Sequence, residues 1–138
     1  MNTHVSFNGN CEEAFKFYEK ALNGKITFMM NYEGTPAAEQ VPPEWSKKVI
    51  HASLDLNGGI LQGCDAPSDR YQKPQGFSVA LEINDAAEAE RAFKALSEGA
   101  TICMPMQETF WAQRFGMLTD RFGIPWMVNC SKVAEQAA

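Results

Sequence analysis

The sequence predicts an α+β fold in which one βαβββ unit is used twice. Two stretches of the chain match each other at a fixed offset of 75 residues, and each matched pair carries the same helix signal. The pairs are Asn10 and Asp85, Glu13 and Glu88, Ala14 and Ala89, Tyr18 and Phe93, Ala21 and Leu96, and Gly24 and Gly99. Because the chain has only 138 residues, of which 45% are apolar, we expect the two repeats to share one core as a single domain.

The first module is expected over about residues 1–65. Asn10 is an N-cap type, Glu13 is placed to complete a capping box, and Gly24 can end the helix in the left-handed conformation. Apolar residues recur at helical spacing between these signals. The expected strands are residues 3–8, 25–32, 48–56 and 59–65, with an Asn57-Gly58 hairpin turn between the last two.

The second module is expected over about residues 76–131 and follows the same order. Its first strand, 76–84, alternates apolar residues with small or polar ones, and its helix lies between Asp85 and Gly99. Asp120 and Gly123 mark the last turn, because Asp can hydrogen-bond its own backbone and Gly tolerates positive φ. The remaining expected segments are strands near 100–105, 113–119 and 124–130, a linker at 66–75, a long proline-containing loop at 33–47 and a polar tail at 132–138.

Charge and composition exclude several kinds of partner. The net charge is −5, and the longest basic run is Lys47-Lys48, so nucleic acid is not expected. We expect no membrane partner and a cytoplasmic location, because no stretch approaches about 20 apolar residues and residues 1–20 lack a signal-peptide pattern. The four cysteines have no metal or redox spacing and are expected to be buried, reduced thiols.

Several short motifs resemble those of one known family. In the second module they are Gln107 to Ala112 (QETFWA), Phe115-Gly116 and Thr119 to Trp126 (TDRFGIPW). In the first they are Ser6 to Cys11 (SFNGNC), Phe17-Tyr18 and His51-Ala52. Over nearly its whole length the chain resembles the PhnB-like branch of the vicinal oxygen chelate superfamily, which includes glyoxalase I, bleomycin-resistance proteins and extradiol dioxygenases. The resemblance implies a curved, cup-like mixed sheet with the helices on its outer face, and a homodimer.

In metal-dependent members of the superfamily, each module supplies one ligand from its first strand and a carboxylate from its last. Counting without gaps from the helices and turns places these positions near Thr3, Gln62, Ser78 and Met127. Such a set does not suit a catalytic divalent ion, which prefers imidazole and carboxylate ligands. A slip of one residue would bring in His4 for Thr3, which adds one strong ligand. We therefore expect no resident metal or other cofactor.

Two residues are candidates for catalysis. His51 is expected on the face of its strand opposite the helix, together with Ser53 and Asp55, where an imidazole could accept or relay a proton. The alternative is a structural histidine hydrogen-bonded across the sheet. Glu108 could be a general base or a single metal ligand, or it could brace the loop that enters the next strand.

An aromatic segment of the second module is the expected wall of a ligand site. Trp111, Gln113, Phe115 and Met117 share one strand face with Thr119, and Arg114, Gly116 and Leu118 share the other. Aromatic and thioether groups with one amide suit a partly apolar ligand. An ordinary core is the alternative interpretation.

These observations favour a protein that binds a small, partly apolar or aromatic molecule in its cup, with His51, Ser53, Gln62 and the aromatic wall as ligand-binding residues. One alternative is a metal-dependent lyase or dioxygenase, with His4, His51, Gln62 and Glu108 as candidate ligands. Another is an assembly or regulatory role for the dimer. The segment from Ser6 to Asn10 lacks the glycine-rich turn of a common methyltransferase type, so that activity is not predicted.

Overall fold

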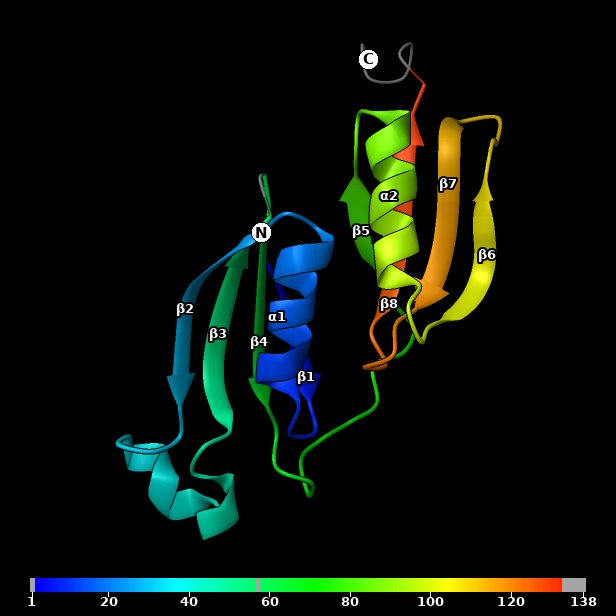
Figure 1. Ribbon diagram of the computed structural model, residues 1–138. Coiled ribbons are helices and arrows are strands. Elements are labelled where there is room, and N and C mark those ends of the chain that lie inside the picture. The colour runs from blue at the N-terminus through cyan, green and yellow to red at the C-terminus, as the bar shows by residue number, and fades with distance from the viewer. Residues whose placement is uncertain (1, 57, 133–138) are drawn as a thin grey trace. The chain divides into compact units, whose positions relative to one another are not determined.

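The computed structural model describes residues 2–56 and 58–132 (Figure 1). The chain divides into two compact units, Met1–Lys73 and Pro74–Ala138. The division falls inside the segment predicted as a linker. Each unit contains one helix and one four-stranded sheet, so the α+β fold class and the βαβββ repeat are confirmed.

Unit 1 has its strands in the order β1-β4-β3-β2. Strand β1 is parallel to β4, and the other neighbours are antiparallel. Two short 3₁₀ helices, η1 and η2, interrupt the long proline-containing loop. The elements are β1 (Thr3–Phe7), α1 (Cys11–Ala21), β2 (Lys25–Asn31), η1 (Pro36–Gln40), η2 (Pro43–Trp45), β3 (Val49–Asp55) and β4 (Ile60–Asp65).

Unit 2 repeats this topology with the order β5-β8-β7-β6, and β5 is parallel to β8. Its first strand is shorter than the sequence predicts, since the alternating segment 76–84 contributes only four residues to the sheet. The elements are β5 (Val79–Glu82), α2 (Ala86–Leu96), β6 (Thr101–Gln107), β7 (Ala112–Thr119) and β8 (Pro125–Ser131).

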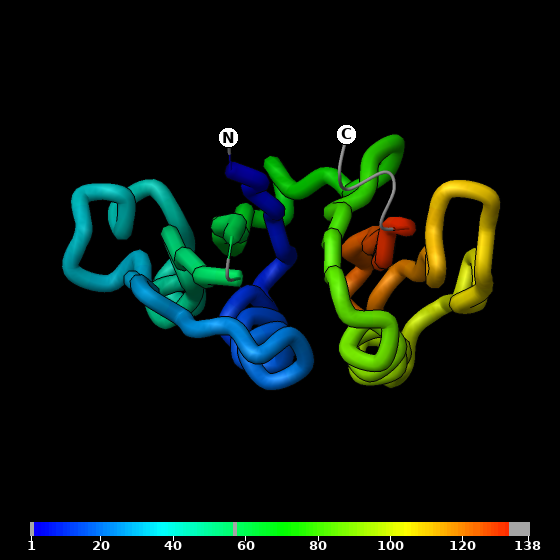
Figure 2. The backbone as a smooth tube through the Cα atoms, turned by 90° about the horizontal axis from the view of Figure 1, so that it is seen from above, coloured from blue at the N-terminus to red at the C-terminus, as the bar shows by residue number. Residues whose placement is uncertain are grey.

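In each unit the helix covers one face of its own sheet (Figure 2). The buried residues of α1 are Cys11, Ala14, Phe15, Tyr18 and Ala21, and those of α2 are Ala89, Ala92, Phe93 and Leu96. Glycines allow the helices to approach closely. A Cβ at Gly63 of β4 would lie 2.8 Å from the Phe15 ring, and one at Gly116 of β7 would lie 2.8 Å from the Phe93 ring. We call the opposite side of each sheet its helix-free face.

The helix ends differ from the prediction more in the first unit than in the second. Asp85 caps α2 as expected, because its side chain accepts a hydrogen bond from the Glu88 N–H at 2.9 Å, although the Glu88 carboxylate pairs with Arg91 and does not reach back. Asn10 makes no side-chain cap bond, so that expectation was wrong. Gly99 has φ +71° as predicted, but after α1 the positive φ belongs to Asn23 (φ 53°) and not to Gly24.

The predicted turns are found where they can be described. Gly123 has φ +90°, and the Asp120 side chain accepts hydrogen bonds from the turn that contains it. Asn57 lies outside the described residues, whereas Gly58 has φ +121° and the Leu56 N–H bonds the Gly59 carbonyl at 2.9 Å.

The cysteines are all free. Cys11 and Cys130 are buried as expected, but Cys64 is half-buried, and the prediction is wrong for Cys103, which is exposed on β6. Within residues 2–56 and 58–132, neither helix is long and apolar enough to cross a membrane.

Candidate functional site

The helix-free face of unit 1 carries His51. Ala52 and Leu54 of β3 are fully buried against the helix side, so the alternating residues His51, Ser53 and Asp55 lie on the other face, as the strand pattern predicts. His51 and Ser53 are half-buried there, and Asp55 is exposed at the end of the strand.

Strand pairing brings His4 and Gln62 to the same face. His4 pairs with Gln62 across β1 and β4, and Gln62 pairs with Ser53 across β4 and β3, so the three residues form a row across three strands. Thr3 pairs instead with Leu61, which is buried on the helix side. Counting from the helix without gaps placed Thr3 opposite Gln62. In the structure His4 occupies that place, so the count differs from the observed register by one residue.

In unit 2 the count differs from the observed register by two residues. Ser78 precedes β5, and Ala80 is the residue that pairs with Met127. The first-strand and last-strand positions of the two units are therefore His4 with Gln62 and Ala80 with Met127. An alanine offers no ligand atom, an amide and a thioether are weak ligands for hard divalent ions, and only one imidazole remains. In the described part of the chain, no three or more His, Cys, Asp or Glu side chains gather closely enough to hold a metal ion. These residues do not fit the four-ligand metal site of the superfamily.

Aromatic rings line the same face of unit 1. The ring centroids of His4 and His51 are 6.3 Å apart with an angle of 25° between the planes, and the Phe28 centroid is 5.7 Å from that of His51. Since β4 lies between β1 and β3, the two histidines approach each other over β4. Partial burial, and then the nearness of His51, lower the pKa of His4.

A hollow of about 560 Å³ opens beside this row. Ser53, Asp55 and Gln62 line this hollow. Ser53 and Gln62 are among the ligand-binding residues that the sequence predicts. Hydroxyl, amide and carboxylate groups supply hydrogen bonds, and Ile60 supplies apolar surface. The full set of lining residues is Asn2, Thr27, Ser53, Asp55, Gly58, Gly59, Ile60 and Gln62.

In unit 2 the predicted division of β7 into two faces is confirmed. Arg114 pairs with Glu90 of α2 at 2.8 Å, and Gly116 lies against Phe93 of α2, so these residues face the helix. Gln113, Phe115 and Met117 therefore lie on the helix-free face, where Met117 pairs with Met127. Trp111 precedes β7, and its ring is 5.3 Å from that of Phe115.

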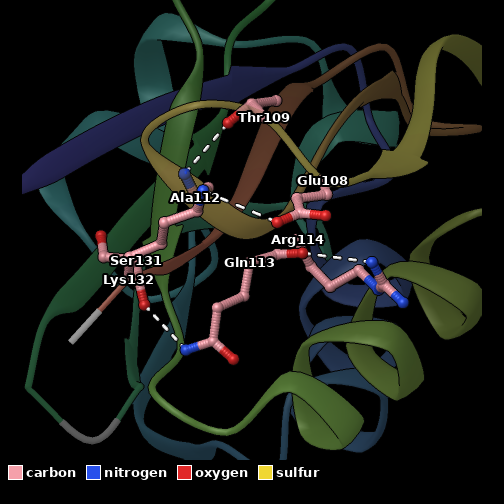
Figure 3. Close-up of polar contacts among 7 residues, drawn as sticks. All are labelled: Glu108, Thr109, Ala112, Gln113, Arg114, Ser131 and Lys132. Atoms are coloured by element: carbon pink, nitrogen blue, oxygen red, sulfur yellow. Dashed lines mark hydrogen bonds and ion pairs between the residues drawn. The ribbon is translucent and has the colours of Figure 1, made fainter.

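A polar group on this face was missed by the sequence analysis. Glu82 pairs with Asn129 across β5 and β8, and its carboxylate accepts hydrogen bonds from the Asn129 amide at 2.7 Å and from the Ser131 hydroxyl at 2.6 Å. The Gln113 amide donates to the Ser131 carbonyl at 3.1 Å, as Figure 3 shows. One signal in the sequence could have revealed this group. Because β5 and β8 are equivalent to β1 and β4 in the repeat, residues of these two strands are expected to lie side by side on one face.

Glu108 lies at the end of β6 and forms an ion pair with Lys132, with 3.6 Å between the charged atoms (Figure 3). The Glu108 side chain is largely exposed, and Lys132 is half-buried. Thr109 accepts a hydrogen bond from the Ala112 N–H at 3.0 Å and closes the same short connection. These contacts join the segment before β7 to the residue after β8.

A family model matches residues 1–129, and its description is 3-demethylubiquinone-9 3-methyltransferase. The chain belongs to this PhnB-like family. It shares its fold with a glyoxylase/bleomycin resistance protein/dioxygenase domain from Frankia, at 13% identity and a TM-score of 0.64 over 95% of each chain. The PhnB-like chain is 30% identical to protein YjdN of Escherichia coli over 96% of its own length and 95% of that protein.

Two solved structures support the fold of this PhnB-like protein. Protein PA1353 of Pseudomonas aeruginosa is 40% identical, with a TM-score of 0.83 over 95% of this chain and 98% of that one. A protein of Bacillus cereus described as a putative 3-demethylubiquinone-9 3-methyltransferase, PhnB protein, is 24% identical, with a TM-score of 0.79 over the same shares. At that identity, the second similarity shows the fold alone.

Proposed function

We propose that this PhnB-like protein binds a small, partly apolar or aromatic molecule and does so without a four-ligand metal site. The observation that carries the proposal is the chemistry of the two helix-free faces. They present aromatic and thioether side chains beside amides and hydroxyls, and the positions where related metal enzymes hold their ligands are His4, Gln62, Ala80 and Met127. Apolar walls with a few polar groups are typical of organic ligand sites.

In this proposal the aromatic part of the ligand packs against Trp111, Phe115 and Met117, and Gln113 helps to orient it. The helix-free face of unit 1 offers hydrogen bonds of its own through His51, Ser53 and Gln62. The superfamily resemblance adds that the protein acts as a homodimer, and the composition of the chain adds that it works in the cytoplasm. Light scattering of the purified protein tests the dimer.

The test is a thermal-shift screen of aromatic, thioether and short apolar molecules. A ligand present at 100 times its Kd stabilises the folded protein by about 2.7 kcal/mol, which raises Tm by several degrees. S-adenosylmethionine belongs in the panel because of the family description. A panel in which no compound raises Tm would contradict the proposal.

Two neighbouring aromatic residues give a matched pair of variants. Trp111 contacts Phe115, whereas Phe110 is 87% exposed. We expect Trp111→Ala to weaken binding of a hit at least tenfold and Phe110→Ala to change it less than threefold. Equal effects of the two substitutions would contradict the assignment of Trp111 and its neighbours as a wall of the ligand site.

The metal-dependent lyase or dioxygenase remains the alternative, with His4, His51, Gln62 and Glu108 as its candidate residues. Elemental analysis of protein purified without a chelator separates the two functions. A first-row metal near one equivalent per chain would favour the enzyme, and it would count against a purely organic site.

A further inference from the structure

We propose that the helix-free face of unit 1 binds an aromatic monocarboxylate, with its carboxylate on His4 and His51 and its ring on Phe28 and Met30. This inference rests on the proposed function, since it names the chemical class of ligand for one of its two faces. It is carried by the way in which two histidines, an amide and an exposed apolar strand meet on one surface.

The first step is the geometry of the histidine pair. The two rings come from β1 and β3, stand on one face and are nearly parallel, with 25° between their planes and 6.3 Å between their centroids. Rings in this arrangement can each donate an N–H to one oxygen of the same carboxylate. Gln62 pairs with His4 and lies between the two strands, so its amide can supply a third donor.

The second step is the apolar surface beside the pair. Met30 of β2 pairs with His51, and Phe28 pairs with Ser53, so both side chains share the face with the histidines. Phe28 is 44% exposed and Met30 is 43% exposed. A large aromatic and a thioether left partly open next to hydrogen-bond donors suit an aromatic ring that carries one acidic group. The adjoining hollow of about 560 Å³ gives such a molecule room.

The third step is the charge of the surroundings. The other titratable groups on this face are Lys25 of β2 and Asp55 of β3, which are neighbours in the strand register, and Cys64 of β4. Asp55 lines the adjoining hollow, so the ligand must direct its carboxylate away from Asp55 and toward the histidines. Burial raises the pKa of the Cys64 thiol, so it stays neutral. Strand β1 contributes only His4.

The experiment is calorimetric titration with 2-naphthoate and with its neutral counterpart 2-naphthamide at pH 7. We expect naphthoate to bind about tenfold more tightly than naphthamide, because hydrogen bonds to an ionised carboxylate are roughly twice as strong as those to a neutral group.

Variants separate the carboxylate contact from the ring contact. His51→Gln and His4→Gln should each weaken naphthoate binding, while naphthamide binding is retained and shows that the variant is folded. Phe28→Ser should weaken both compounds by similar factors. Lys94→Gln, at an exposed position of α2 in unit 2, is the matched control and should leave both unchanged.

Failure of this inference differs from failure of the proposed function. Naphthoate binding that equals that of naphthamide, or that is unchanged in both histidine variants, would overturn the carboxylate site and leave the organic-binding function standing. Absence of naphthoate binding, with hits elsewhere in the thermal-shift panel, would do the same. A panel without any hit would overturn the proposed function.

Discussion

Units 1 and 2 have the same strand order, yet they place their buried aspartates differently. Asp65, 1% exposed, ends β4 and accepts hydrogen bonds from the N–H groups of Gly9 at 3.0 Å, Cys11 at 2.9 Å and Val49 at 2.9 Å. It therefore ties the last strand to the start of α1 and to the start of β3. Its partners lie 16 to 56 positions away in the sequence.

Asp120, 4% exposed, lies in the turn between β7 and β8. It accepts hydrogen bonds from the N–H groups of Phe122 at 2.8 Å and Ile124 at 3.0 Å and from the Trp126 indole at 2.8 Å, all within six positions. In unit 2 the last strand meets the segment before the helix through Cys130, whose thiol bonds the Asn84 carbonyl at 3.5 Å. The comparison shows two ways to hold the last strand of the same fold in place. In unit 1 a carboxylate bonds residues distant in the sequence, and in unit 2 residues of the turn and of the segment before the helix do so.

The largest expected effect follows from removal of Asp65. Asp65→Ala should lower the free energy of unfolding by roughly 4 kcal/mol, because three N–H groups lose a carboxylate acceptor and two of them are buried. Chemical denaturation measures the loss. Asp69→Ala, at an exposed position of the linker, is the control and should stay within about 0.5 kcal/mol of the parent.

Asp120→Ala sharpens the comparison. We expect a smaller loss of roughly 3 kcal/mol, since the partners are local and the turn can relax around the gap. The fluorescence of Trp126 should also change, because its indole loses the Asp120 carboxylate. A loss equal to or greater than that of the Asp65 variant would show that sequence distance between the partners does not decide the cost.

The next effect concerns the approach of the helix to the sheet. Gly63→Ala should destabilise the protein by roughly 2 kcal/mol, because the new Cβ would lie 2.8 Å from the Phe15 ring and 3.2 Å from the Val5 carbonyl oxygen. Gly59→Ala adds the same atom where nothing lies within 4 Å and should be nearly neutral. Equal melting temperatures for the two variants would mean that α1 shifts freely on its sheet.

These cases explain what the sequence could predict. The helices and strands follow from apolar periodicity and turn residues, which act within a few positions, and their bounds fall close to the expected ones. Asp120 was assigned to its turn because its backbone partners are two and four residues away. The long-range contacts of Asp65 leave no local pattern, so its role could not be read from the sequence.

The candidate sites show the same limit. The alternation within β3 and β7 predicted which side chains share the helix-free faces, because that depends on one strand at a time. The register between strands depends on two strands at once, so the pattern of a single strand cannot predict it. The count from the helices therefore selected Thr3, which pairs with Leu61, although His4 is the residue that pairs with Gln62. The Glu82, Asn129 and Ser131 group was missed for the same reason, since it spans two strands.

The smallest expected effect separates the two helix starts. Asp85→Ala should cost about 1 kcal/mol, because its carboxylate caps the Glu88 N–H, whereas Asn10→Ala should cost less than about 0.5 kcal/mol, because Asn10 makes no side-chain cap bond. Both residues are exposed, so packing contributes little to either change. Denaturant midpoints of the two variants measure the difference. If Asn10→Ala costs as much as Asp85→Ala, Asn10 caps α1 in solution, and Asp65 then shares the stabilisation of that helix start with a local residue.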